Sequence, residues 1–243
     1  MVESKIINKL KITPKTKVLD VGGAMKQRSE IKVDTLVDLL RPEESPYTKS
    51  TLKAKNFVRL DVTTQTLPFK DKEFDVVLCT HTLEDLPTPF LVLEQMQRVA
   101  KRGYIETPLM GTDIVFSHVD TTNWLTGFRR TPGIAHHKWL FWKHLGKLWV
   151  IPKNYPLLYS PEFHVTSWRG ETNLSYFWEG KINYHKVDDL DFHMLVSLYR
   201  EFVKQNEASL TFGKPLIYLD NPYYFAKELV KLFLKKGTAF EKH

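Results

Sequence analysis

The sequence predicts an α/β fold, in which a mostly parallel sheet has helices on both faces and a β-rich, aromatic C-terminal elaboration follows. Within residues 1–108, short apolar segments alternate with helical or polar ones, as in parallel sheets with right-handed crossovers. In the second half this alternation ends, and hairpin-like segments rich in aromatic residues take its place. We therefore expect a core over residues 1–110 and a cap region over residues 111–243, whose hairpins and helices pack on the core.

The composition fits one α/β domain with a sizeable core. The chain has 243 residues, of which 42% are hydrophobic. No run approaches the ~18 apolar residues that cross a bilayer, and the N-terminal residues are too polar for a secretory signal, so we expect a cytoplasmic protein. Cys79 is the only cysteine, which excludes an internal disulfide. The net charge of +7 is spread along the chain, which favours a solvated basic surface over a nucleic-acid interface.

Five segments have the apolar, branched character of buried strands. They are Lys17–Val21, Thr35–Leu39, Phe57–Leu60, Phe74–Cys79 and Tyr104–Pro108.

Four segments carry apolar residues at helical spacing. They are residues 3–11, Phe90–Ala100, Leu190–Asn206 and Phe225–Lys236. Residues 24–32 leave room for barely two helical turns, and residues 41–55 indicate a loop. Two hairpins are predicted, over His137–Ile151 with its turn near Gly146 and over Leu174–Val187 with its turn at Gly180.

The first strand runs straight into a glycine turn. Residues 17–24, KVLDVGGA, place Gly22 and Gly23 directly after a buried strand. A turn without Cβ atoms lets backbone N–H groups approach a ligand, and ligands of open α/β sheets bind beyond the carboxyl ends of the strands. We interpret residues 20–24 as the floor of a nucleoside-cofactor site, with a plain strand–loop junction as the alternative.

Asp38 ends the second predicted strand, 16 positions after Gly22. An acidic residue about 20 positions past a glycine turn is placed to accept hydrogen bonds from both ribose hydroxyls. A turn residue at a strand end is an equally good interpretation of Asp38.

The first half of the chain resembles class I S-adenosylmethionine-dependent methyltransferases, most closely the methyltransferase type 11 set. The resemblance rests on the ordered segments KVLDVGGA, TLVDL, FVRLDVTTQTLPFKDKEFDVVLCTHTLEDLPTP and VAKRGYIETP, and it covers about residues 15–108. It implies a Rossmann-like core that binds S-adenosyl-L-methionine.

The resemblance also implies roles for the residues at the first two strand ends. Asp20, Gly22 and Gly23 would face the methionine part of the cofactor. Asp38 would hold the ribose hydroxyls.

The third and fourth strand ends receive roles in the same way. Asp61, with Val62 beside it, would accept a hydrogen bond from the exocyclic amine of adenine. Thr80 and His81 would line the pocket near the sulfonium, and His81 would be the best-placed general base. The alternatives are a turn residue for Asp61, a strand-end hydroxyl for Thr80 and a helix-start histidine for His81.

Two features depart from the family pattern. Ala24 and Lys26 stand where the second and third glycines are usual, and the helix after the loop is unusually short. A short helix offers less dipole at the pocket. A protein that keeps the fold without catalysis is therefore an open alternative.

Polar residues after the fifth strand lie where such folds often build the acceptor pocket; they are His118, Asp120, His136 and His137. Adjacent residues on a strand point to opposite faces, so His136 and His137 should not share one ion, and we predict no metal site. Many aromatic residues also crowd the second half and form either the core of a cap or one wall of an acceptor pocket. They are Trp124, Phe128, Trp139, Phe141, Trp142, Trp149, Trp168, Phe177 and Trp178.

These observations predict an enzyme that transfers a methyl group from S-adenosylmethionine to a small-molecule, lipid or sugar-intermediate acceptor. The donor is already activated, so positioning is the main requirement of catalysis. The alternatives are a binding or scaffold protein without catalysis and a basic RNA methyltransferase. No Asn-Pro-Pro-Tyr-like segment follows the fourth strand, which argues against methylation of exocyclic base amines.

Overall fold

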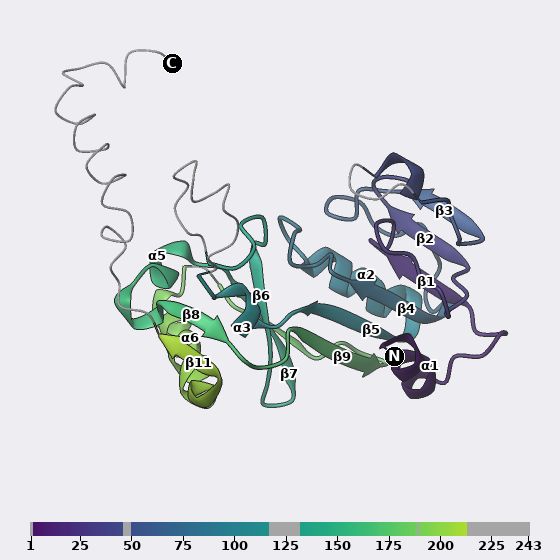
Figure 1. Ribbon diagram of the computed structural model, residues 1–243. Coiled ribbons are helices and arrows are strands. Elements are labelled where there is room, and N and C mark those ends of the chain that lie inside the picture. The colour runs from purple at the N-terminus through teal and green to yellow at the C-terminus, as the bar shows by residue number, and fades with distance from the viewer. Residues whose placement is uncertain (1, 46–49, 117–131, 189, 213–243) are drawn as a thin grey trace, which may run out of the picture.

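The computed structural model describes residues 2–45, 50–116, 132–188 and 190–212, and its main sheet has six strands in the order β3-β2-β1-β4-β5-β9 (Figure 1). The first five strands run parallel, and β9 pairs antiparallel with β5. Their bounds are β1 Val18–Val21, β2 Thr35–Asp38, β3 Asn56–Arg59, β4 Phe74–Thr80, β5 Ala100–Pro108 and β9 Asn173–Glu179. The predicted α/β fold class is confirmed.

Within the described residues, α2 covers one face of this sheet and α1 the other. The apolar side of α2 (Phe90–Val99) packs with Leu19, Val77 and their neighbours in the larger core cluster. On the other face, Ile6 and Leu10 of α1 (Val2–Leu10) pack with the strands β1, β4 and β5. Both helices arise from apolar residues at helical spacing, as the sequence predicts.

The connection from β1 to β2 holds no helix. Residues 22–34 form bends, so the two helical turns predicted over residues 24–32 are wrong. A 3-10 turn, η1 (Pro42–Glu44), follows β2.

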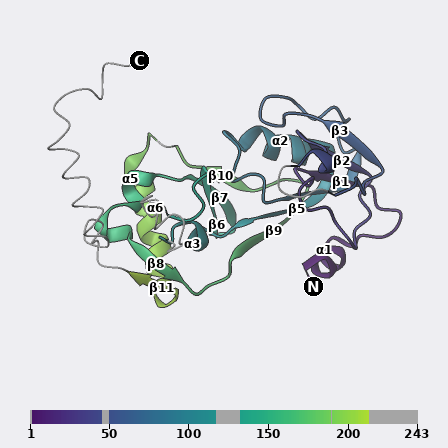
Figure 2. The same ribbon diagram turned by 45° about the horizontal axis from the view of Figure 1, so that its top comes forward.

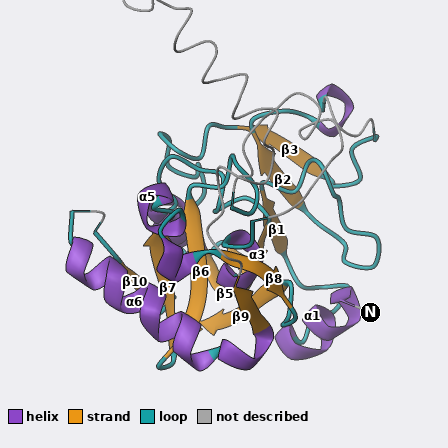
Figure 3. Ribbon diagram, turned by 60° about the vertical axis from the view of Figure 1, so that its left-hand side comes forward, coloured by secondary structure: helices purple, strands orange, loops and turns teal. Residues whose placement is uncertain are grey.

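The second part of the chain builds two smaller sheets, with strands in the orders β10-β7-β6 and β11-β8. Their bounds are β6 Trp139–His144, β7 Lys147–Pro152, β8 Val165–Trp168, β10 Tyr184–Lys186 and β11 Leu210–Phe212. Short helical segments lie between them, namely α3 Met110–Asp113, α5 Tyr155–Leu158, η2 Pro161–Phe163 and η3 Glu207–Ser209. The long helix α6 (Phe192–Gln205) buries one side in the second core cluster and lies alongside these strands (Figure 3).

The two predicted hairpins have different outcomes. The β6–β7 hairpin is confirmed, with Leu145 and Gly146 at its turn. The hairpin over Leu174–Val187 is wrong, because β9 joins β5 and β10 pairs parallel with β7. The helix predicted over Phe225–Lys236 lies outside the described residues.

The second part of the chain therefore completes the sheet of the first part. Figures 1 and 2 show β5 and β9 between the strands β1–β3 on one side and α5, α6 and β8 on the other. The division at residue 110 stays a prediction. Within the described part of the chain, no helix has both the length and the apolar character needed to span a bilayer.

Candidate functional site

The strand order reverses at β1, which has β2 on one side and β4 on the other. In open α/β sheets, ligands bind at such a switch point, beyond the carboxyl ends of the strands. The register pairs Val21 with both Val37 and Cys79, so the residues after these three positions reach the same edge of the sheet.

A pocket of about 140 Å³ opens at this edge. It brings together four residues that the sequence predicts for cofactor binding, Gly22, Asp38, Asp61 and Val62. The other lining residues are Val37, Leu39, Leu60, Thr63, Thr82 and Leu86. The pocket thus has carboxylates at its rim and apolar side chains in its wall.

The two glycines of the turn make room for the protein's own side chains. Gly22 has a φ of +75°, and a Cβ there would lie 2.2 Å from Oγ1 of Thr82. A Cβ on Gly23 would lie 2.5 Å from Oδ2 of Asp20. Any other residue at position 22 would be strained both by its backbone conformation and by this contact.

The carboxylate of Asp38 holds the glycine turn against β2. Its Oδ2 accepts from the backbone N–H of Ala24 at 2.9 Å, and its Oδ1 accepts from those of Leu39 and Leu40 at 2.7 and 3.4 Å. A carboxylate has about four lone-pair sites, so these contacts leave capacity for a further donor such as a ribose hydroxyl.

Asp61 is held in a turn of its own. Its Oδ1 accepts from the backbone N–H and the hydroxyl of Thr63, at 2.9 and 2.5 Å. The Thr63 hydroxyl, followed by its backbone N–H, lowers the pKa of the Asp61 carboxyl. Asp61 is therefore a charged acceptor at the rim of the pocket.

Asp20 and Thr80 lie apart from this pocket, and Arg28 connects them. The Arg28 Nη2 donates to Thr80 Oγ1 at 2.8 Å, and its Nε lies 3.5 Å from Asp20 Oδ2. Burial raises the pKa of Asp20 to about 6, and the Arg28 guanidinium opposes this rise. Among the described residues, Asp20 Oδ1 and Arg28 Nε have no hydrogen-bond partner.

Arg28 therefore occupies the space between the ends of β1 and β4, which the family resemblance gives to the methionine part of a cofactor. A second pocket, of about 290 Å³, lies beside it and is lined by Asp20, Arg28 and residues 29–33 among others. Sequence reasoning missed Arg28, because residues 24–32 show no periodicity that would place it.

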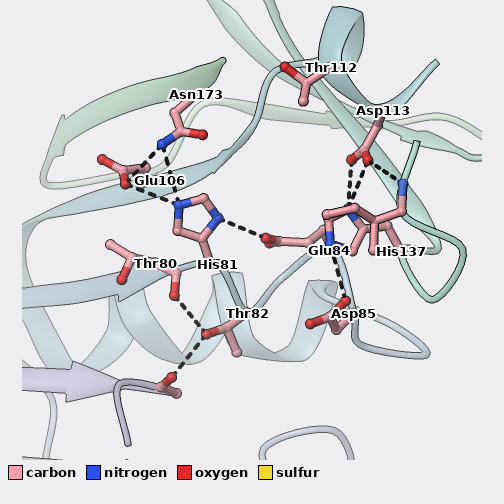
Figure 4. A network of polar contacts seen from close by, with 12 residues as sticks. Thr80, His81, Thr82, Glu84, Asp85, Glu106, Thr112, Asp113, His137 and Asn173 are labelled. Atoms are coloured by element: carbon pink, nitrogen blue, oxygen red, sulfur yellow. Dashed lines mark hydrogen bonds and ion pairs between the residues drawn. The ribbon is translucent and has the colours of Figure 1, made fainter. Parts of the chain in front are cut away.

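His81 lies between two carboxylates (Figure 4). Its Nε2 is 3.2 Å from Glu106 Oε1, and its Nδ1 is 3.3 Å from Glu84 Oε1. The hydrogen bonds to Glu106 and then to Glu84 raise the pKa of His81 to about 9. Because the imidazole is protonated at neutral pH, it cannot accept a proton there, and its predicted role as a general base lacks support.

His136 and His137 do not lie on a strand, as the prediction against a shared ion assumed. His136 and His137 precede β6, which begins at Trp139, so the strand geometry used to separate their side chains does not apply. His118 and Asp120 lie outside the described residues.

The sequence matches one protein-family model. Residues 31–105, from the connection after β1 to the middle of β5, match the family described as "Methyltransferase domain". These residues are therefore similar to a methyltransferase domain. The match confirms the predicted resemblance to methyltransferases, from which we expect S-adenosylmethionine as the cofactor. It begins after the glycine turn, which is where the sequence departs from the family pattern.

Solved structures that resemble the methyltransferase domain are distant. They include a putative methyltransferase of antibiotic biosynthesis from Anabaena variabilis (15% identity, 45% of each chain, TM-score 0.37). An S-adenosylmethionine-dependent methyltransferase from Aquifex aeolicus (18% identity) aligns over 44% of this chain and 64% of its own, with a TM-score of 0.31. A putative methyltransferase from Bacillus halodurans (16% identity) aligns over 51% and 64%, with a TM-score of 0.34.

In each comparison the aligned part spans less than two thirds of the other protein. The TM-scores are too low for these likenesses to support an assignment. The comparison with curated proteins gives no match.

Proposed function

We propose that this chain binds S-adenosylmethionine at the ends of β1–β4 and transfers its methyl group to a small-molecule, lipid or sugar-intermediate acceptor. The observation that carries the proposal is the meeting of Gly22, Asp38, Asp61 and Val62 in one pocket at the switch point of the sheet. A cytoplasmic location is part of the same proposal.

The residues at the pocket fit an adenosyl group. Asp38 offers carboxylate oxygens to ribose hydroxyls, and Asp61 offers a charged acceptor to the exocyclic amine of adenine. Leu60, Val62 and Leu86 supply the apolar surface that a purine ring requires. The cofactor supplies an activated methyl group, so the task of the chain is to hold donor and acceptor in line.

Arg28 lies where the methionine end of the cofactor would bind. The Nε of its buried guanidinium lies 3.5 Å from Asp20 Oδ2 and has no hydrogen-bond partner among the described residues. A guanidinium is suited to bind a carboxylate with two parallel hydrogen bonds, so we propose that Arg28 holds the methionine carboxylate.

Calorimetry with S-adenosylhomocysteine tests cofactor binding, with Asp38→Ala as the site variant. Loss of the ribose contact should weaken binding by about 1–3 kcal/mol, or roughly 5- to 150-fold. Asp71→Ala is the matched control, because Asp71 is an exposed aspartate on the turn before β4. No heat from a folded wild-type sample at millimolar ligand would reject the proposal.

The second candidate is a protein that keeps the fold without catalysis. The observation that favours it is the Asp20–Arg28–Thr80 contact, which fills the methionine end of the crevice with the protein's own side chain. The basic RNA methyltransferase alternative rests only on the net charge of +7 and predicts binding that weakens steeply with salt.

Arg28→Ala separates the first two candidates when two ligands are compared. If Arg28 holds the carboxylate, the substitution weakens binding of S-adenosylhomocysteine and leaves binding of adenosine unchanged, because adenosine lacks the methionine part. If Arg28 only fills the crevice, the same substitution strengthens binding of S-adenosylhomocysteine.

A further inference from the structure

A second cluster of polar side chains lies where the loop after β4 meets the segment before β6 (Figure 4). Asp85 belongs to the loop, and His136 and His137 to the segment. The Nε2 atoms of His136 and His137 lie 3.6 and 3.7 Å from Asp85 Oδ1. One ligand atom from each of the three residues can be chosen so that all lie within 4.8 Å of one another.

The backbone fixes these two segments against each other. The N–H groups of Lys138 and Trp139 both donate to the carbonyl of Glu84, at 2.7 and 3.3 Å. Asp85 directly follows Glu84, and His137 directly precedes Lys138. The three side chains are therefore brought together by main-chain contacts that do not depend on their own interaction.

Asp113 orients His137 from behind. The Nδ1 of His137 lies 2.9 and 2.8 Å from the two carboxylate oxygens of Asp113, and both residues are buried. A carboxylate accepts, so Nδ1 donates to Asp113, and Nε2 is the ring nitrogen that faces Asp85 and is free to bind an ion. A histidine that donates its second ring nitrogen to a carboxylate is the usual arrangement behind a metal-bound imidazole.

Lys153 completes the support for Asp113. Its Nζ is fully buried, lies 3.9 Å from Asp113 Oδ1 and donates to the carbonyl of Ile134 at 2.8 Å. The buried Asp113 thus has a cation on one side and the imidazole of His137 on the other. This arrangement fixes the orientation of the ring.

The remaining ligand atoms of the cluster, Nε2 of both histidines and Oδ1 of Asp85, lie near one another without a hydrogen bond between them. The distance of 3.7 Å between His137 Nε2 and Asp85 Oδ1 is too long for a hydrogen bond. A divalent cation between them would satisfy both. With bonds of about 2.0–2.2 Å in tetrahedral geometry, neighbouring ligand atoms lie roughly 3.4 Å apart, which is close to the 3.6 and 3.7 Å found.

We propose that Asp85, His136 and His137 form a binding site for a divalent transition-metal ion of the zinc type, with Asp113 orienting His137. Two imidazoles and one carboxylate leave a fourth position open to water or another ligand. A bound ion would tie the loop after β4, which also carries His81, to the start of β6.

The test is metal titration of the full chain after treatment with a chelator. Calorimetry should show one Zn²⁺ bound per chain, and Co²⁺ should give the visible absorption of a tetrahedral nitrogen–oxygen site. His136→Ala and Asp85→Asn change exposed residues, so the fold should survive while binding is lost or strongly weakened. Asp113→Asn should weaken binding by about 10- to 100-fold.

His193→Ala is the matched control, because His193 is exposed in the first turn of α6 and lies outside the cluster. This control should bind Zn²⁺ as the wild type does. No Zn²⁺ uptake by the folded wild type, or equal affinity in the wild type, His136→Ala and Asp85→Asn, would overturn the proposal. The titration contains no S-adenosylmethionine, so its outcome is independent of the cofactor proposal.

Discussion

His81 has a raised pKa because it hydrogen-bonds to two carboxylates. Glu106 and Glu84 raise its pKa from 6.5 to about 9. A histidine with a raised pKa in the folded state stabilises the fold fully below its unfolded pKa, and this contribution is lost as the pH rises through the folded pKa. The side chain is 40% exposed, so solvent screening limits the size of the effect.

We predict that the free energy of unfolding falls between about pH 6.5 and pH 9, and that Glu106→Gln reduces this fall. Urea unfolding of both proteins across this pH range measures the difference. An NMR titration of the His81 ring gives its pKa directly. A wild-type His81 that titrates near pH 6.5 would contradict the prediction.

A substitution at Gly22 tests whether the turn after β1 requires a residue without a side chain. Gly22→Ala should destabilise the protein by about 1–2 kcal/mol through its positive φ, with about 1–3 kcal/mol more from the contact with Thr82. The double variant Gly22→Ala/Thr82→Ala should recover the second contribution only. Urea unfolding of the single and double variants measures both, and equal losses in the two would show that Thr82 does not restrict the turn.

Part of the candidate site could be predicted because it lies at strand ends. Gly22, Asp38 and Asp61 end or follow apolar runs that mark buried parallel strands, and the ends of such strands meet at one edge. Arg28 could not be found in this way, since it lies in a connection without periodicity and contacts Thr80 across 52 positions. Sequence pattern indicates which backbone positions reach the edge but not which distant side chain fills it.

At the scale of elements, the strands and long helices of the first half agree with prediction within a few residues, whereas strand pairing in the second half does not. Residues 174–187 alternate in polarity around Gly180, as a hairpin would. The alternation indicates that the two faces of β9 differ in polarity, but it does not identify the strand with which β9 pairs. β5 offers an open edge, and β9 pairs with it over seven register positions instead.

The β6–β7 hairpin carries an unusual turn residue. Leu145 has a φ of +49° and Gly146 a φ of +73°, and Leu145 is 79% exposed. Two-residue turns with both φ values positive favour Asn-Gly. We predict that Leu145→Asn stabilises the protein by about 0.5–1 kcal/mol, because leucine is strained in this region. Thermal and urea unfolding measure the gain in stability. As a control, Leu145→Val should lower stability, because a β-branched residue is strained further at positive φ. Equal stability of Leu145→Asn and Leu145→Val would contradict the argument.

At the scale of the whole molecule, the two parts of the chain share one core. Seven apolar side chains from the second part are buried in the same cluster as residues of β1, β4 and α2. They are Phe141, Leu148, Val150, Leu174, Tyr176, Trp178 and Ile182. The ring of Trp178 also packs where a Cβ on Gly103 would stand, 2.8 Å away, so β5 and β9 fit each other closely.

We therefore predict that residues 1–108 alone do not fold cooperatively, whereas residues 1–212 do. Each of the seven missing side chains contributes about 1.5–3 kcal/mol by burial, so together they match or exceed the 5–15 kcal/mol by which a typical protein is stable. Without β9, the edge of β5 would also be unpaired and prone to aggregation. Urea unfolding followed by circular dichroism, together with gel filtration, distinguishes the two fragments. A monomeric 1–108 fragment with a cooperative transition would show instead that residues 1–108 fold independently of the chain that follows them.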